Sequence, residues 1–233
     1  DTFLHDSAAL GEILRRAEDG CEIAIVEGNR GLHDGFDADG SHSTAELAKQ
    51  IGAPALLVLD VTKMTRTAAA IVAGCRSLDP DLNLAGVILN QVATARQKKV
   101  ICEAIERHAG LPVVGAIPRL RGDDPLPGRH LGLVTAVEHP RAQQAIERAA
   151  ETVSEHVDLD RVLEIARETK SVDFPPVEAP VRGDEVRVGV FEDEAFSFYY
   201  PENLEMLEAS GATLVKISPS KDEQLPVVDG LYL

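Results

Sequence analysis

The chain has 233 residues, of which 44% are hydrophobic, and a formal net charge of −16 at pH 7. This apolar fraction argues against disorder along the whole chain, and the negative charge argues against general binding to nucleic acid or anionic lipid. No apolar stretch approaches the roughly 20 residues that cross a bilayer, and the first residues do not resemble a secretory signal. The three cysteines are widely spaced, and we expect them to be reduced and buried in a cytoplasmic protein.

Along the first 170 residues, the spacing of apolar residues alternates between that of helices and that of strands. Helices are expected over about 3–17, 43–52, 65–74, 95–108, 141–154 and 158–169. Buried strands are expected over 22–26, 55–60, 84–90 and 112–117. Strands that are apolar throughout, with helices between them, indicate a doubly wound α/β domain with a mainly parallel sheet.

Polar residues follow the predicted strands where each one ends. Glu27, Asp60, Asn90 and Pro118 all lie at such carboxyl ends. Parallel α/β sheets bind ligands in the crevice beyond this edge. We therefore expect these residues to share one rim.

The composition changes after residue 170. The segment 171–185 has three prolines, several charges and little periodicity, which predicts a semi-rigid linker. The α/β pattern then resumes, with strands expected over 186–191, 214–217 and 229–233 and a helix over 201–209. These features predict one domain over 1–170 and the start of a second α/β domain over 186–233.

The strongest local signal is the run Val26-Glu27-Gly28-Asn29-Arg30-Gly31-Leu32-His33-Asp34-Gly35. Two carboxylates flank a glycine-rich turn, and Mg²⁺ bound to phosphates takes oxygen ligands from one or two such groups. The pattern is therefore typical of a magnesium–phosphate site. An exposed acidic turn without a ligand explains the spacing equally well.

Several blocks of the sequence, in the same order, resemble one protein family. They cover 27–35, 43–49, 86–90, 129–134 and 193–204, and the last contains Phe198-Tyr199-Tyr200-Pro201-Glu202-Asn203. On these blocks, which extend over nearly the whole chain, it resembles the cobyrinic acid a,c-diamide synthase family.

The resemblance implies a fold and a reaction. The family has a P-loop-type α/β synthetase domain followed by a class I glutaminase domain. The synthetase transfers the γ-phosphate of ATP, bound with Mg²⁺, to an acetate carboxylate of a tetrapyrrole, and ammonia from glutamine then displaces the phosphate. The implied function is amidation of the a- and c-acetates of cobyrinic acid through an acyl phosphate, in cobalamin biosynthesis.

Individual residues take expected roles from this resemblance. Glu27 resembles the magnesium-binding acid and Asp34 the acid on the substrate-side loop, so both are expected to be catalytic. Asn90 resembles an asparagine that hydrogen-bonds adenine, and Pro118 and Arg119 would flank the base. Without the resemblance, we would interpret Asn90 as a cap at a strand end.

Three further residues are candidates for substrate binding. Lys63 and Arg66 follow Asp60 near a predicted helix start, where they could bind phosphate or substrate carboxylates. A solvated basic turn is an equal alternative for both. His33 replaces a residue that is often aromatic in relatives, which implies that it shapes the substrate pocket.

The chain departs from the family pattern at both ends. It has no Gly-x-x-x-x-Gly-Lys-Ser/Thr phosphate loop, which in the family precedes the segment that matches residue 1. The glutaminase cysteine is expected beyond Leu233. We therefore expect a piece of a two-domain ligase, without its first strand and phosphate loop, that is inactive by itself.

Other functions are compatible with parts of the sequence. Loop 29–33 differs from the commonest cobyrinate form, so an amidase of sirohaem, sirohydrochlorin or nickel-sirohydrochlorin is the second candidate. A partitioning-type P-loop ATPase and a non-catalytic α/β module are more distant, and the glutaminase-like block argues against the former. The oligomeric state is open, with a homodimer as one option.

Overall fold

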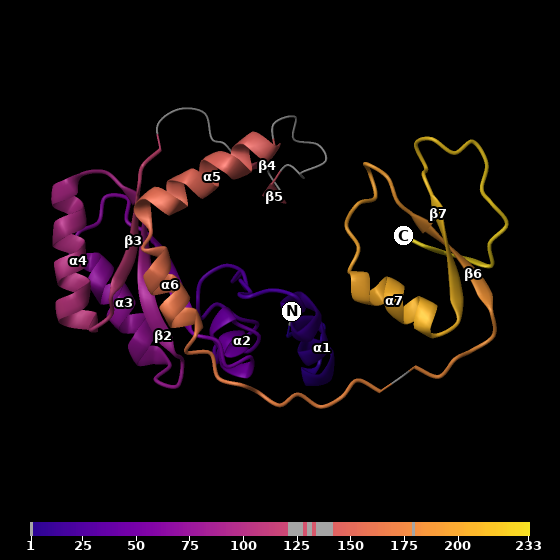
Figure 1. Ribbon diagram of the computed structural model, residues 1–233, viewed down its shortest axis with the longest axis horizontal. Helices are drawn as coiled ribbons and strands as arrows, with labels where there is room; N and C mark the ends of the chain where they lie inside the picture. The colour runs from indigo at the N-terminus through magenta and orange to yellow at the C-terminus, as the bar shows by residue number, and fades with distance from the viewer. Residues whose placement is uncertain (1, 121–127, 130–131, 134–141, 179) are drawn as a thin grey trace. The chain divides into compact units, whose positions relative to one another are not determined.

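The computed structural model describes residues 2–120, 128–129, 132–133, 142–178 and 180–233. These residues form two compact units, and the boundary along the chain falls between Pro175 and Pro176 (Figure 1). This boundary lies inside the expected linker, whose described residues form no helix or strand. No helix in the described part of the chain is both long and apolar enough to cross a membrane.

The first unit is built on a three-stranded parallel sheet in the order β1-β2-β3. The strands are β1 (Ala55–Asp60), β2 (Leu84–Val92) and β3 (Val113–Pro118). Helix α3 (Thr67–Leu78) connects β1 to β2, and α4 (Ala95–Ala109) connects β2 to β3. The alternating α/β fold with parallel strands is confirmed.

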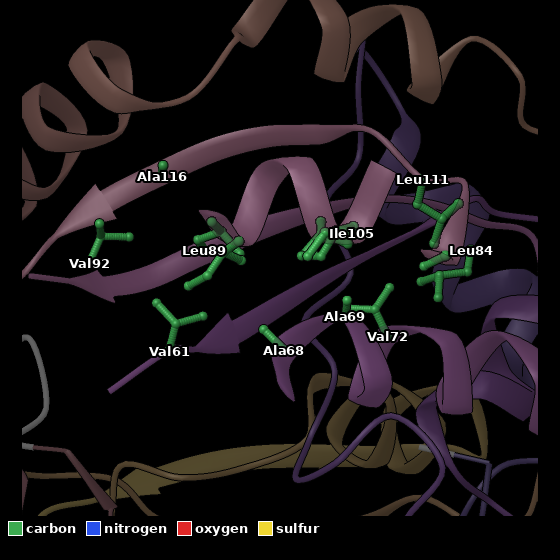
Figure 2. Packing of buried hydrophobic residues seen from close by; sticks show 14 of the residues in the cluster. Val61, Ala68, Ala69, Val72, Leu84, Leu89, Val92, Ile105, Leu111 and Ala116 are labelled. Atoms are coloured by element: carbon green, nitrogen blue, oxygen red, sulfur yellow. The ribbon is translucent and has the colours of Figure 1, made fainter. Parts of the chain in front are cut away.

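The main core lies between the sheet and the α3–α4 layer. Leu89 from β2, Val72 from α3 and Ile105 from α4 are each 0% exposed (Figure 2). The strand periodicity is 2, so Ile88 points to the opposite face from Leu89. These residues explain why β2 reads as apolar throughout, since each of its faces packs against other side chains.

Helices α5 (Ala142–His156) and α6 (Leu159–Ala166) contact β3. Their junction lies close to the strand, where a Cβ built on Gly115 would be 2.8 Å from Val157 Cγ2 and 3.3 Å from Ile88 Cγ2. Gly115 therefore provides the space for this contact. The helices cover the sheet face opposite to α3 and α4 (Figure 1), as expected for a doubly wound domain. Two short antiparallel strands, β4 (Gly128–Arg129) and β5 (Gly132–Leu133), complete this unit.

Two short helices precede the sheet, α1 (Ser7–Glu18) and α2 (Thr44–Gln50). The Asp6 carboxylate caps α1 by accepting from Ala9 N–H at 2.9 Å. Ser43 caps α2 by accepting from Glu46 N–H at 3.3 Å, and the Glu46 carboxylate accepts from His42 N–H. The Ser-x-x-Glu spacing of Ser43 and Glu46 is typical of a helix start, and the helix expected over 43–52 is present as α2.

Two sequence-based expectations are wrong in this region. The apolar segment 22–26 forms no strand, and Ile25 is 89% exposed. Hydrophobicity alone does not make a strand, because a strand must exchange backbone hydrogen bonds with a neighbour, and none involves 22–26 within the described chain. Cys21 is exposed rather than buried, whereas Cys75 and Cys102 are partly buried, and desolvation raises the pKa of both thiols.

The second unit contains a three-stranded parallel sheet in the order β7-β6-β8. The strands are β6 (Val186–Phe191), β7 (Ala212–Ile217) and β8 (Gly230–Tyr232). Helix α7 (Pro201–Ala209) connects β6 to β7 and starts with Pro201, which suits the first turn of a helix. All four elements were expected from the sequence.

Asp193 joins two loops at the carboxyl edge of this second sheet. Its carboxylate accepts from the backbone N–H groups of Ala195 at 2.8 Å and Ser220 at 3.0 Å, and from the Ser218 hydroxyl at 3.3 Å. The backbone hydrogen bonds, led by the one from Ser220 and followed by the one from Ala195, lower the Asp193 pKa to about 2. They favour the ionised carboxylate, which accepts hydrogen bonds more strongly than a protonated carboxyl group.

We expect Asp193→Asn to destabilise the second unit at neutral pH and to have little effect in acid. Because the folded pKa lies below the usual value of 3.8, the ionised Asp193 stabilises the fold above that value, and the contribution is lost as the pH falls towards 2. Urea unfolding of the wild-type and Asp193→Asn proteins over this pH range can be followed by circular dichroism. The difference between their free energies of unfolding should become smaller as the pH falls. A constant difference would show that Asp193 acts through packing alone.

Candidate functional site

The carboxyl ends of the three strands of the first sheet form a common rim. Asp60 lies opposite Asn90 in the register of β1 and β2, and Val92 lies opposite Pro118 in that of β2 and β3. Arg119 N–H donates to the Val92 carbonyl at 2.9 Å. The structure thus brings Asp60, Asn90 and Pro118 together as predicted, with Arg119 next to Pro118. Glu27 lies on a separate loop because its predicted strand does not form.

The acidic and basic groups of this rim influence each other. Asp60 Oδ1 accepts from Thr62 N–H at 2.7 Å. Hydrogen bonds from Thr62 lower the pKa of Asp60, and the charge of Arg119 lowers it further. Asp60 is therefore ionised at neutral pH, and Arg119 is electrostatically coupled to it.

The Asn90 side chain is half-buried and fixes the backbone turn that follows it. Its Oδ1 accepts from Gln91 N–H at 2.9 Å, while Gln91 has a left-handed φ of 62°. The Asn90 carbonyl accepts from Val61 N–H at 3.0 Å. Oδ1 is thus engaged locally, as a strand-end cap would be, and no hydrogen bond from the amide nitrogen is found within the described residues.

The loop between β1 and α3 carries the two predicted basic residues. Lys63 is exposed and has a φ of 57°, which is uncommon for a residue with a side chain. Arg66 is the N-cap residue of α3 and is also exposed, as expected from the sequence. Its side chain lines an open hollow of about 450 Å³, together with Thr67, Ala69, Ala70, Ala73 and His108. Arg66 thus lies over the α3–α4 layer, and Lys63 does not line this hollow.

One residue that sequence reasoning missed, Gln97, connects this loop to α4. Its Nε2 donates to the carbonyl oxygens of Val61 and Met64, both at 2.8 Å, and its Oε1 accepts from Ala93 N–H at 2.7 Å. Gln97 N–H donates to Thr94 Oγ1 at 3.1 Å. The Thr94-x-x-Gln97 spacing is a capping-box signal that could have revealed the local pair. The bonds to Val61 and Met64 depend on the tertiary fold.

The glycine-rich loop carries the two acids of the predicted magnesium–phosphate site. Glu27 is exposed, and no hydrogen bond or ion pair to it is found within the described residues. Asp34 Oδ2 accepts from Gly31 N–H at 3.1 Å, and Asp34 N–H donates to the Gly31 carbonyl at 3.1 Å. Asp34 is thus held in a tight turn, and Glu27 is free to meet a ligand.

Several hydrogen bonds attach this loop to the rest of the first unit, among them one from the Thr44 hydroxyl to the Asn29 carbonyl at 3.3 Å. Ala45 N–H at the start of α2 donates to the Leu32 carbonyl at 2.9 Å. His33 is half-buried, and its Nε2 lies 3.0 Å from the Cys75 carbonyl oxygen in α3. His33 thus anchors the loop to α3 in this structure, and its predicted role in substrate binding stays a prediction.

The donors in this region fit a magnesium ion that arrives with a nucleotide. Among the described residues, no three His, Cys, Asp or Glu side chains are close enough together to hold a metal ion by themselves. Mg²⁺ needs only one or two protein carboxylates when phosphates and water supply the other oxygen ligands. The exposed carboxylate of Glu27 has the chemistry that such a ligand requires.

Comparison with known proteins shows to which family the chain belongs. The model of the AAA domain family matches residues 5–124, about half of the chain. The cobyrinate a,c-diamide synthase of Magnetococcus marinus is 45% identical over 221 residues, which are 92% of this chain and 47% of that protein. The chain belongs to the cobyrinate a,c-diamide synthase family. The resemblance on which the sequence analysis relied is therefore confirmed.

Archaeal members of the cobyrinate a,c-diamide synthase family match the whole chain. Those of Methanosarcina acetivorans and Archaeoglobus fulgidus, which carry the same name, are 39% and 40% identical over 100% of this chain. The chain spans about half the length of these relatives, 50% and 51% respectively. No solved structure matches the chain significantly.

Proposed function

We propose that this chain is part of an enzyme that amidates the a- and c-acetate carboxylates of cobyrinic acid in cobalamin biosynthesis, with ATP as energy source and glutamine as amide donor. The observation that carries this proposal is the match of the whole chain, across both compact units, to proteins named cobyrinate a,c-diamide synthase. The first unit would be the synthetase domain and the second the start of the glutaminase-like domain. The three free cysteines of the chain agree with a cytoplasmic location.

The rim of the first sheet supports a nucleotide site. In this proposal the free amide nitrogen of Asn90 donates to the adenine edge, while Pro118 and Arg119 flank the base. A crevice at the carboxyl ends of parallel strands is the usual place for such a ligand. Lys63, Arg66 and His33 are proposed contacts of the tetrapyrrole or of phosphate.

The reaction needs an activated carboxylate, because a carboxylate oxygen is a poor leaving group. A carboxylate oxygen of the substrate attacks the γ-phosphorus of ATP, and ADP leaves. Ammonia from glutamine then attacks the acyl carbon, and inorganic phosphate leaves as the amide forms. Bound Mg²⁺ supplies positive charge to the transferring phosphoryl group. Glu27 would hold this ion, and Asp34 would orient the substrate on the neighbouring turn.

Changes in the two loop acids test the proposal in the product of the complete open reading frame. We expect Glu27→Gln and Asp34→Asn each to lower kcat about a hundredfold or more, because the first weakens the proposed hold on Mg²⁺ and the second the proposed orientation of the substrate. The measurement is the glutamine- and ATP-dependent mass gain of cobyrinic acid. Asp39→Asn, an exposed acid of the same loop, should leave kcat unchanged.

The same assay separates the alternatives. Amidation confined to sirohaem, sirohydrochlorin or nickel-sirohydrochlorin would move the substrate assignment to that group. ATP hydrolysis without amidation of any tetrapyrrole would instead favour a partitioning-type ATPase. Full activity of the Glu27→Gln variant would remove Glu27 from the proposed mechanism.

A further inference from the structure

A single side chain from α4 holds the loop that carries Lys63. The Gln97 amide nitrogen donates to the carbonyls of Val61 and Met64, which lie on either side of Lys63 in the sequence. The same turn is also held by hydrogen bonds from Val61 N–H to the Asn90 carbonyl, from Met64 N–H to the Val61 carbonyl and from Thr62 N–H to Asp60 Oδ1. Gln97 therefore joins the β1–α3 loop to the segment that follows β2.

The backbone conformation of Lys63 explains why this loop needs support from Gln97. A left-handed φ of 57° is unfavourable for a residue with a Cβ, and such a residue persists only when its surroundings hold it. Lys63 is exposed and starts from a loop at the rim that includes Asp60, Asn90 and Arg119. The direction of its long side chain thus depends on a backbone that Gln97 fixes at two carbonyls.

We infer that Gln97 is a positioning residue that holds Lys63 at the rim, where its ammonium group meets an anionic group of a bound reactant. The anion is a phosphate of ATP or a carboxylate of the tetrapyrrole, which share the same chemistry toward a lysine. This inference rests on the proposed function and adds a residue that acts through Lys63.

Three substitutions in the full-length protein isolate this role. Gln97→Met keeps the length of the side chain and removes all three of its side-chain hydrogen bonds. Lys63→Met removes the ammonium group that Gln97 is inferred to place. Gln50→Met is the matched control, because Gln50 is a partly buried glutamine whose amide donates to Glu46 at 3.2 Å on α2, away from the rim.

The measurement is a double-mutant cycle on KM for ATP, cobyrinic acid and glutamine, with ATP binding measured by calorimetry. We expect Lys63→Met to raise KM for ATP or for cobyrinic acid, and Gln97→Met to raise the same KM about tenfold. In the Lys63→Met background, Gln97→Met should add less than about twofold, because a residue that acts through another is non-additive with it. KM for glutamine should stay constant, and Gln50→Met should change none of these constants.

Independent, additive effects of the two substitutions would overturn the inference, as would a loss of thermal stability without a change in KM. Lack of any effect of Lys63→Met would also overturn it. If the wild-type protein binds ATP but amidates no tetrapyrrole, only the proposed substrate is refuted. The double-mutant cycle is then evaluated with the Kd of ATP instead of KM. A wild-type protein that neither amidates nor binds ATP overturns both.

Discussion

Replacing Gly35 with alanine is expected to lower the amidation rate of the full-length enzyme about a hundredfold, because a displacement of about 1 Å at a reacting group can cost that much. A Cβ on Gly35 would lie 2.6 Å from the Gly40 carbonyl carbon and closer still to the Ser41 carbonyl oxygen. Backbone atoms cannot rotate away as a flexible side chain can. The chain around Asp34 would therefore have to move.

The Gly35 region has little freedom to absorb such a movement. Phe36 N–H donates to the Ser41 carbonyl at 2.8 Å, and the Asp37 carboxylate accepts from Ser41 N–H at 3.0 Å and from its hydroxyl at 2.7 Å. These bonds, led by the one from Ser41 N–H, lower the Asp37 pKa. The 36–41 turn is thus closed on itself, so the added methyl group pushes against a fixed neighbour.

Gly74→Ala is the matched control for this experiment. Gly74 lies within α3, and nothing is found within 4 Å of a Cβ built on it. Alanine should there stabilise the helix by about 0.5–1 kcal/mol and leave kcat unchanged. Equal activities of the two alanine variants would show that the 34–41 turn is not part of the site.

Replacing Ile105 with alanine is expected to destabilise the first unit by about 3–4 kcal/mol. Ile105 is 0% exposed, in the cluster that also contains Leu89 and Val72 (Figure 2). The large-to-small change removes apolar contacts and leaves a cavity among side chains that belong to both helices and the sheet. Such a cavity cannot be filled by the short alanines of α3 that neighbour it.

Urea unfolding followed by circular dichroism measures this loss, since the chain contains no tryptophan to serve as a fluorescent probe. The two units need not unfold together. If the unfolding curve shows two transitions, Ile105→Ala should shift only the transition of the first unit. Val100→Ala, on the same helix but at a side chain that is 37% exposed, should change stability by no more than about 0.5 kcal/mol. A similar loss for both variants would contradict the assignment of Ile105 to the core.

The central part of the fold could be predicted from the sequence for a simple physical reason. The strands β1, β2 and β3 are apolar on both faces, and α4 between β2 and β3 has its own caps, Thr94 at its start and the left-handed Gly110 at its end. Local signals and tertiary packing agree there. The grouping of Asp60, Asn90 and Pro118 at one edge followed directly from the parallel arrangement.

Prediction failed where a segment needed a distant partner. The 22–26 run has the hydrophobicity of a strand, but hydrophobicity does not show whether a neighbouring strand exists. The bond between the His33 ring and the Cys75 carbonyl, 42 residues away, was likewise not predictable from the sequence, and the expected substrate contact of His33 stays a prediction. Gln97 likewise gave a local capping signal and no indication of its bonds to Val61 and Met64.

The strand order of the two sheets has a consequence for how the chain folds. In the first unit, the spatial order β1-β2-β3 repeats the order along the chain, so each new strand adds to the edge of the strand made just before it. Each pairing spans only one strand–helix–strand unit, so the sheet can grow strand by strand during synthesis. In the second unit, β6 is made first and lies in the centre, with β7 on one side and β8 on the other. The pairing of β6 with β8 can form only after β8 has been synthesised, so we expect this sheet to be completed later than the first.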